Sequence, residues 1–338
     1  MIVVIDTLFT QHDPGTGHPE RPERITALLE LVESLPYRKD LEMIPPRTGT
    51  WEEAAWVHDP QYLDLLKRTS GSRAMLDPDT RTSPQSVATA LVAAGSVLSV
   101  AEKAQSSKRP GFAMIRPPGH HAERNRAMGF CLLNNVAIAA EWAVRQAGAR
   151  RVAIVDFDVH HGNGTQHSFY DRNDILYISS HQFPFYPGTG ALKETGIGPG
   201  KDFTVNFPLS AGTGDGVLTR IYEQIVPPIL EQFQPDWIFV SAGYDAHRDD
   251  PLAQLEVSVE GFARVVRSLQ ECARRLCEGR IVYLLEGGYN LQALSKSVQA
   301  SLEVILGKRN PEPTSFPDDS KWNEYVTALR RVHGRWKF

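Results

Sequence analysis

The stretch VAIVDFDVHHGNG, residues 152–164, decides how the rest of the chain is interpreted. It begins as a continuous apolar run, which is typical of a strand buried on both faces of a parallel sheet. It then turns polar abruptly, with acids and histidines directly after the apolar residues. Because ligands of open parallel α/β sheets bind beyond the carboxyl ends of the strands, the stretch predicts both the fold class and the edge of the sheet that carries a site.

Short apolar runs alternate with longer amphipathic stretches along the whole chain. We expect strands at 2–5, 111–115, 151–157, 175–179, 203–207, 237–242 and 281–285. Helices are expected at about 22–34, 84–103, 135–146, 216–232, 258–278 and 291–306. This alternation, with no Pro/Gly/Ser-rich linker, predicts a single α/β domain over residues 1–338, with a mainly parallel central sheet and helices on both faces. Residues 308–338 are expected to form a loop and a last, basic helix.

Composition limits the class of protein. With 41% hydrophobic and 22% charged residues, the 338-residue chain has ample material for a large core. We find no uninterrupted apolar run near the roughly 20 residues that span a bilayer, and no basic segment precedes Asp6, so neither a membrane association nor a signal peptide is expected. Three cysteines without metal-finger spacing favour a cytoplasmic location. A net charge of −4 gives no electrostatic reason to expect nucleic-acid binding, and the oligomeric state is left open.

Polar clusters follow four of the expected strands. They are RPPGHH at 116–121, DFDVHHGNG at 156–164, GYDAH at 243–247 and GGYN at 287–290. Each cluster alone is weak evidence of function. Because the carboxyl ends of parallel strands meet at one edge of a sheet, the four clusters together predict one site.

The second of these clusters has the spacing of a metal site. Side chains alternate along a strand, so Asp156, Asp158 and His160 share one face. Buried carboxylates and an imidazole at this spacing need a cation to offset their desolvation. Asp158 and His160 are therefore candidate ligands with Asp245 as the third, and an open fourth position is typical of a catalytic zinc site. The ligand set also suits Fe(II), Co(II) or Mn(II).

A plainer interpretation is that Asp156 and Asp158 cap a following helix and that His160 is an ordinary polar residue. That interpretation would usually hold for one acid near the end of a strand. Here it leaves the other histidines and the acid of the same edge unexplained, and we favour the metal site.

His120 and His121 follow Pro-Pro-Gly, so both could line one pocket. An imidazole near its ordinary pKa is the usual proton carrier at neutral pH, although either histidine could instead be a metal ligand. Tyr289 follows two glycines that let the backbone approach closely, and its hydroxyl can donate to a developing oxyanion. A tyrosine in this context often only packs, so the pattern leaves both roles open.

Together these residues resemble the histone deacetylase superfamily, which includes acetylpolyamine amidohydrolases and acetoin-utilisation proteins. The resemblance covers nearly the whole chain, from GTGHPERPERI at 15–25 to EGGYN at 286–290. Between them, RPPGHH, GFCLLNN, DFDVHHGNGT, FYPGTG and GYDAH occur in the family's order. GHPERPER and HHGNGT are more similar to class II and bacterial members than to class I enzymes.

The resemblance implies a role for each polar residue. Zinc would be bound by Asp158, His160 and Asp245. His121 would be the general base and then the acid for the leaving amine, His120 an electrostatic partner oriented by Asp156, and Tyr289 the oxyanion donor. Asn163 stands where some members carry an aspartate, so we expect a lower pKa for His121 than in those relatives.

The resemblance also implies a substrate tunnel and structural potassium. Gly129, Phe130 and Tyr186 would line the tunnel, Leu252 would lie at its mouth and Asp79, rather than Asp77, would bind substrate at the rim. Arg24 would lie near an acetate exit channel, or simply anchor a helix. The expected donors of a first potassium ion are Asp156, Asp158, His160, Ser179 and Ser180. Those of a second are Phe169, Arg172, Ile175 and Phe203.

The implied activity is zinc-dependent hydrolysis of N-acetyl-lysine or N-acyl-lysine side chains in peptides or proteins, with release of acetate. One alternative is an amidohydrolase for acetylpolyamines or other small acyl-amines. Polyamine-specialised members resemble one another in a glutamate at the tunnel mouth, where this chain has Leu252. More remote alternatives are a two-manganese ureohydrolase and an inactive acyl-lysine-binding protein.

Overall fold

An eight-stranded parallel sheet forms the centre of the protein, whose computed structural model describes residues 1–312, 316 and 319–338. The strand order is β2-β1-β5-β10-β9-β6-β7-β8. The strands are β1 Ile2–Val4, β2 Glu42–Met43, β5 Gly111–Ala113, β6 Val152–Asp156, β7 Ile175–Gln182, β8 Thr204–Leu209, β9 Trp237–Ala242 and β10 Ile281–Leu285. A separate antiparallel hairpin consists of β3 Ala74–Asp77 and β4 Thr80–Thr82.

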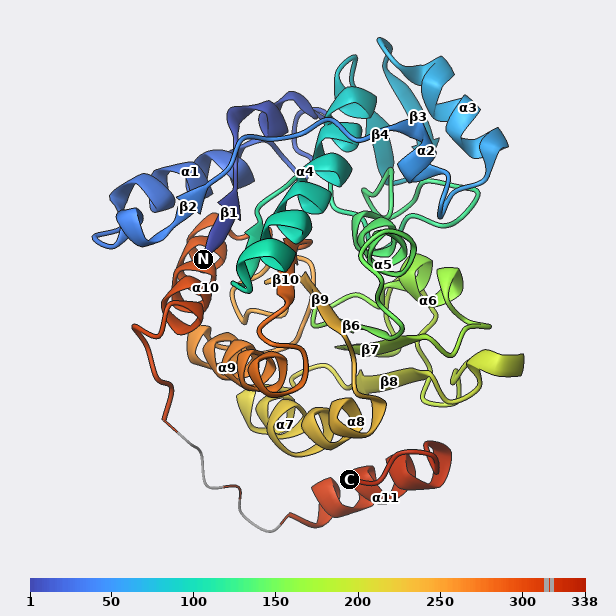
Figure 1. The fold of residues 1–338 in the computed structure, drawn as a ribbon, viewed down its shortest axis with the longest axis vertical. Helices are drawn as coiled ribbons and strands as arrows, with labels where there is room; N and C mark the ends of the chain where they lie inside the picture. The colour runs from blue at the N-terminus through green and yellow to red at the C-terminus, as the bar shows by residue number, and fades with distance from the viewer. Residues whose placement is uncertain (313–315, 317–318) are drawn as a thin grey trace.

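Helices cover both faces of this sheet (Figure 1). One group contains α4 Ser86–Ser107, α5 Asn135–Arg145 and α6 Asn163–Ser168. The other contains α1 Glu23–Ser34, α7 Asp215–Arg220, α8 Val226–Phe233, α9 Val259–Leu276 and α10 Leu291–Ile305. The shorter elements are a 3-10 turn Thr7–Gln11, α2 Trp51–Ala54 and α3 Pro60–Thr69, and the last helix is α11 Ser320–Val332. The predicted single α/β domain with a parallel sheet and helices on both faces is confirmed.

Local sequence explains most differences from the predicted elements. All seven predicted strands are present, but β7 extends three residues further, to Gln182, and the two-residue β2 is too short to show a period. The helix predicted at 216–232 is instead divided into α7, a π-helical turn Ile221–Ile225 and α8. Pro227 and Pro228 account for this division, because proline lacks an N–H donor and is tolerated only in the first turn of a helix.

In the described part of the chain, three α-helices lie outside the predicted elements: the four-residue α2, and α3 and α6. The sequence reasoning missed α3, which begins at Pro60 after Asp59 and buries Tyr62, Leu63 and Leu66. Proline at the first position and apolar residues three and four apart are a recognisable start signal, which could have identified it. The six-residue α6 directly follows the HHG sequence and was also missed.

Helix α4 is long and apolar enough to span a membrane by length and composition alone. In the folded protein, 67% of its most apolar window is buried. The helix packs on β1, β5 and β10, so its apolar character belongs to the core of the sheet.

The predicted last helix is present as α11, whereas residues 313–315 and 317–318 of the predicted loop lie outside the described residues. Helix α11 buries Leu329 and Trp322, and the C-terminal segment continues onto the rest of the domain. The Trp336 indole N–H donates to the Asp202 carbonyl at 2.8 Å. This part of the chain is therefore packed against the domain rather than simply solvated.

The topology brings the four polar clusters to one edge of the sheet. They follow β5, β10, β9 and β6, which are adjacent in the strand order. Asp156, at the end of β6, is in register with Ser241 of β9, and Leu285 of β10 is in register with Ala242 of β9. The strands end at the same level, so the loops that follow them surround one space.

Candidate metal centre and active site

Three buried side chains converge in the loops after β6 and β9. The candidate ligand atoms of Asp158, His160 and Asp245 all lie within 4.8 Å of one another. The Nδ1 atom of His160 lies 3.3 Å from Asp158 Oδ1 and 3.2 Å from Asp245 Oδ2. These are the three residues that the sequence predicts as metal ligands, and the structure brings them together.

Backbone N–H groups orient both carboxylates of this triad. Val159 N donates to Asp245 Oδ1 at 3.0 Å, and Gly287 N donates to Asp158 Oδ2 at 2.8 Å. A Cβ atom at Gly287 would collide with the Asp245 carboxylate, and one at Gly243 would collide with Asp158. Glycine at these two positions therefore lets the backbone approach the carboxylates closely.

The donor set fits a divalent cation. Burial and the nearby Asp158 carboxylate raise the pKa of Asp245 to about 7. Burial opposes protonation of His160, but its hydrogen bonds to Asp158 and Asp245 outweigh that effect and raise its pKa to about 9. Without a metal, the proton held by His160 compensates the two carboxylates. A divalent cation would take the place of that proton and leave two carboxylates and one neutral imidazole as its ligands.

The two adjacent histidines have opposite electrostatic environments. Burial disfavours the charged form of His120, but the Asp158 and Asp156 carboxylates outweigh it and raise its pKa to about 10. Burial and the neighbouring His120 lower the pKa of His121 well below its usual value. The rings lie 4.0 Å apart, centroid to centroid. One ring is thus suited to remain a cation and the other a neutral base.

Each of these histidines has its own hydrogen-bond partner. His120 Nδ1 lies 3.1 Å from Asp156 Oδ2, and His121 Nδ1 lies 2.7 Å from Asn163 Oδ1. Asp156 is itself held by the Tyr177 hydroxyl, which donates to Oδ2 at 3.0 Å. The structure therefore pairs the residues as the resemblance implies, with Asp156 behind His120 and Asn163 behind His121.

A narrow cavity of about 190 Å³ leads to the triad. We call it the tunnel. Of the described residues, those that line it are Asp79, His121, Gly129, Phe130, His160, Phe185, Tyr186, Leu252 and Tyr289. All five predicted substrate-binding residues are among them. Phe185 was missed, although it stands in the quoted FYPGTG motif, and its ring stacks on His160 with centroids 5.6 Å apart.

The tunnel wall is braced from the β3–β4 hairpin. Asp79 Oδ1 accepts from Gly129 N at 3.0 Å, and Thr80 Oγ1 accepts from Phe130 N at 3.0 Å. Gly129 and Phe130 have φ values of +56° and +69°, and positive φ is uncommon for a residue such as phenylalanine. Asp79 lines the tunnel, whereas Asp77 is not among the described lining residues.

Tyr289 lies in the tunnel wall and is held from two sides. Its backbone N–H donates to Asp250 Oδ2 at 2.7 Å, and the Arg24 guanidinium carbon lies 5.0 Å from its ring centroid. Burial and the Asp245 carboxylate raise the pKa of Tyr289 well above its usual value. The phenol therefore keeps its proton and can donate a hydrogen bond into the tunnel.

Three carboxylates that position the site were missed from the sequence. Asp250 binds the backbone of Tyr289 and of Leu252, whose N–H lies 3.0 Å from Oδ1. Glu286 accepts from Gly119 N at 2.7 Å and thereby fixes the loop that carries the two histidines. Glu123 accepts from Asn163 Nδ2 at 2.5 Å. Glu286 directly follows β10, and this position at the end of a strand was a weak sign of a functional role. Asp250 and Glu123 lie in loops, where no sequence spacing indicates such a role.

The expected potassium donors remain predictions. For the first group, Asp156 and Ser179 are register partners on β6 and β7, and Tyr222 Oη lies 3.0 Å from Ser180 Oγ. For the second, the Phe169 carbonyl accepts from Arg172 N at 3.0 Å, and the Phe203 carbonyl accepts from Tyr177 N at 2.9 Å. The segments of each group lie close together, as the expectation requires.

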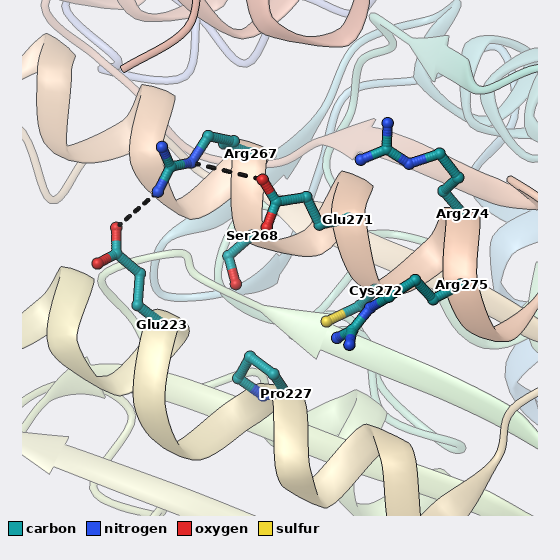
Figure 2. Close-up of a pocket in the computed structure, with 8 residues that line it drawn as sticks. All are labelled: Glu223, Pro227, Arg267, Ser268, Glu271, Cys272, Arg274 and Arg275. Carbon is teal, nitrogen blue, oxygen red and sulfur yellow. Dashed lines mark ion pairs between the residues drawn. The ribbon is translucent and has the colours of Figure 1, made fainter. Parts of the chain in front are cut away.

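A second cavity, of about 410 Å³, lies between α8 and α9 (Figure 2). We call it the charged pocket. Within it, Arg267 lies between Glu223, at 3.6 Å, and Glu271, at 3.8 Å (Figure 2). Among the described residues, the metal-binding geometry is found at Asp158, His160 and Asp245, none of which lines this pocket.

Comparisons with known proteins agree on one family. A family profile described as "Histone deacetylase domain" matches residues 18–305. A protein named "Probable deacetylase" from Archaeoglobus fulgidus is 35% identical in an alignment that covers 99% of this chain and 98% of that protein. "Histone deacetylase 14, chloroplastic" from Arabidopsis thaliana is 40% identical over 86% of this chain and 74% of its own length. The crystal structure of the HDA15 HD domain superimposes with a TM-score of 0.91 at 36% identity, covering 99% of this chain and 94% of that one.

Proposed function

The chain belongs to the histone deacetylase family, and from this premise we propose that it is a zinc-dependent enzyme that removes acetyl groups from N-acetyl-lysine side chains. Hydrolysis of acyl-amides is the activity of the family. The observation that carries the proposal is the convergence of a candidate metal-ligand triad, two adjacent histidines and the Tyr289 phenol on one cavity.

Zinc would be held by Asp158, His160 and Asp245, which leave a coordination position open. When bound, the ion lowers the pKa of a water molecule and polarises the acyl carbonyl. Fe(II), Co(II) and Mn(II) suit the same ligands. We also propose two structural potassium ions, one at each of the two sets of expected donor residues described above.

His121 is the proposed general base. Its Nδ1 faces the Asn163 carbonyl oxygen, so Nε2 is left to take the proton from the attacking water. The same nitrogen then returns that proton to the leaving amine. His120 Nδ1 lies 3.1 Å from Asp156 Oδ2, which orients the ring beside His121, and its proposed role is to stabilise the negative charge that develops nearby. The Tyr289 hydroxyl donates to the oxyanion that forms on the acyl carbonyl.

The tunnel supports an acyl-lysine substrate. Phe130 and Tyr186 would flank the aliphatic part of the side chain, as their places in the lining allow. Leu252, at the mouth, offers no charge to a polyamine, whose remaining ammonium groups would lose water on entry. Asp79 Oδ1 already accepts from Gly129 N, and the carboxylate would bind the substrate at the rim by accepting a further hydrogen bond from it. Acetylpolyamines and other small acyl-amines are the second candidate class, because the Asp79 carboxylate could also attract a cation.

The cytoplasmic location stays a proposal based on cysteine content. Two of the relatives are named as chloroplastic histone deacetylases, from Arabidopsis thaliana and from Oryza sativa subsp. japonica. Neither name fixes the compartment of this chain.

The test is to time hydrolysis of an acetyl-lysine peptide, acetylspermidine and acetylputrescine by zinc-loaded protein, each with and without a chelator. Chelator-sensitive cleavage of the peptide is expected. Preference for the polyamines would keep the chemistry and overturn the substrate. Failure to cleave any of them, in protein shown to bind one zinc per chain, would reject the acetyl substrate and favour longer acyl groups or an inactive binding protein.

A further inference from the structure

We propose that Glu123 is a positioning residue, which acts through the Asn163 amide to hold His121 in the tautomer that carries its proton on Nδ1. The inference rests on the proposed function for what His121 does in the reaction. The hydrogen bonds that carry it are properties of the folded chain alone.

A continuous series of hydrogen bonds runs from His121 to the protein surface. His121 Nδ1 lies 2.7 Å from Asn163 Oδ1, and Asn163 Nδ2 donates to Glu123 Oε1 at 2.5 Å. Glu123 Oε1 and Oε2 lie 2.8 Å and 3.1 Å from His167 Nδ1. The first three side chains are buried, whereas that of His167 is 43% exposed.

Donor and acceptor types allow one arrangement of this series. An ionised carboxylate only accepts hydrogen bonds, so the Asn163 NH₂ group must face Glu123. Its carbonyl oxygen then faces His121 and also only accepts, so His121 Nδ1 must carry the proton. A neutral imidazole has a single N–H, and Nε2 is therefore unprotonated. The Met128 thioether, a weak acceptor 3.3 Å from Asn163 Nδ2, agrees with this orientation.

Asparagine at position 163 is what makes Glu123 necessary. An aspartate there would accept through either oxygen and would fix His121 without help. An amide presents an acceptor on one side and donors on the other, and a 180° flip would turn its NH₂ group toward His121. That orientation favours the wrong tautomer, with the proton on Nε2. In an aspartate-bearing relative, the negative charge would be in contact with His121. In this chain it lies on Glu123, which contacts Asn163 rather than His121.

Glu123 is equipped to remain ionised. Burial opposes ionisation, but hydrogen bonds from His167 and Asn163 outweigh it and lower the pKa of Glu123 below its usual value. Its backbone is held independently, because Glu123 N donates to Arg126 O at 3.0 Å and Glu123 O faces His58 Nδ1 at 2.9 Å. A change confined to the side chain therefore leaves the loop anchored.

The test uses three variants: E123Q, N163D and the double variant E123Q/N163D. The double variant exchanges the positions of the carboxylate and the amide. E123Q allows the Asn163 amide to flip, and N163D places two carboxylates in contact, so that one must hold a proton. E123Q is expected to lower kcat by about 10- to 100-fold, the range for hydrogen bonds to charged groups. N163D should lose less, because a protonated Glu123 can donate to the carboxylate introduced at position 163, which still accepts from His121. KM should change less than about twofold, because Glu123 does not line the tunnel.

The double variant should recover most of the lost rate. The carboxylate introduced at position 163 would accept from His121, and the amide introduced at position 123 would donate to that carboxylate. Both hydrogen bonds are then restored with the charge moved. A residue that only stabilises the loop would not produce this rescue. E123Q/N163D with a kcat no higher than that of E123Q, in protein that melts as the wild type does, would overturn the proposal.

The tautomer itself can be measured without any activity. In ¹⁵N-histidine-labelled protein, free of metal, the ring nitrogen shifts and couplings of His121 should show Nδ1–H in the wild type and a mixture or Nε2–H in E123Q. Nε2–H in the wild type, or an unchanged tautomer in folded E123Q, would refute the inference. A wild type that holds Nδ1–H but cleaves no acyl-amide would refute the proposed function and leave this inference standing.

A matched control is Glu223→Gln in the charged pocket. Glu223 is also a partly buried glutamate with a charged hydrogen-bond partner, the Arg264 guanidinium at 2.7 Å. The substitution should leave the His121 tautomer and kcat at wild-type values. A loss of rate in E223Q equal to that in E123Q would mean that removal of any buried carboxylate has the same effect, which would also overturn the proposal.

Discussion

The tunnel and the charged pocket both hold buried or half-buried ionisable groups, and the charged pocket is the larger of the two, at about 410 Å³ against about 190 Å³. In the charged pocket, Glu223 and Glu271 each have an arginine partner. In the tunnel, Asp158 and Asp245 share the imidazole of His160 between them. Glu223 and Glu271 are thus compensated by arginines of the same chain, whereas Asp158 and Asp245 share one imidazole, an arrangement that suits a bound cation.

The two regions also differ in what holds the side chains. The residues of the charged pocket stand on helix surfaces, where long side chains adjust to one another. The residues of the tunnel stand in loops at the ends of adjacent strands, and Asp250, Glu286 and Asp79 bind the backbone of those loops. Catalysis depends on such fixed geometry, so acidic side chains that share one partner on a rigid frame are better grounds for proposing an active site than the volume of a cavity.

The largest expected effect comes from removing a ligand of the triad. Asp245→Asn should reduce zinc binding and lower kcat/KM by roughly 10³-fold or more, because the metal contributes several kcal/mol to the transition state and about 1.4 kcal/mol corresponds to tenfold. Zinc content by atomic absorption and peptide deacetylation measure the two effects. Glu271→Gln, the counterpart in the charged pocket, should change neither. Full zinc occupancy in active D245N protein would contradict the assignment.

Tyr289→Phe should come next in size. The variant loses a single oxyanion donor and should lower kcat by ~10²–10³-fold while it remains folded and binds zinc. Steady-state kinetics and thermal melting distinguish the loss of the hydroxyl from a loss of structure. If most of the wild-type kcat survived, Tyr289 would be a packing residue of the tunnel wall.

The pH dependence of the rate should be a smaller effect. As the proposed general base, His121 acts in its neutral form, so activity should be lost as pH falls through the pKa of this residue in the folded protein. Since burial and His120 lower that pKa below the ordinary value of about 6.5, kcat/KM should fall less than about twofold between pH 7.5 and 6.5. A pH–rate profile over pH 5 to 8 tests this expectation. In E123Q/N163D, where a carboxylate adjoins His121, the acid limb should move to higher pH; an unmoved limb would count against the role of Asn163.

The smallest effect is expected in the charged pocket itself. Arg275 pairs with Glu231 at 2.8 Å, and both side chains are about half exposed. Arg275→Ala should leave kcat/KM unchanged and alter the free energy of unfolding by less than about 1 kcal/mol, as exposed ion pairs usually do. Denaturant unfolding and the deacetylation assay provide the measurements. A marked loss of activity would show that the charged pocket is coupled to the tunnel.

Much of the fold and of the site was predictable because the relevant signals are local. The apolar run of β6 is read directly from VAIVD, and the alternation of Asp156, Asp158 and His160 follows from strand geometry. The resemblance to the family then predicts the role of Tyr289 and five substrate-binding residues, all of which line the tunnel, but not Phe185. By contrast, α3 was missed despite its start signal, and β2 has only two residues from which to recognise it.

The sequence by itself determined the α/β class, the edge of the sheet that carries the site, and the chemical types of its ligands. Only the tertiary structure decided which groups orient them: Asp250 binds Tyr289, Glu286 binds the loop of the two histidines, and Glu123 binds Asn163. These partners lie 39, 167 and 40 residues apart. Strand and helix periods arise between neighbours along the chain, whereas a hydrogen bond between distant loops exists only once the strands beneath them have paired.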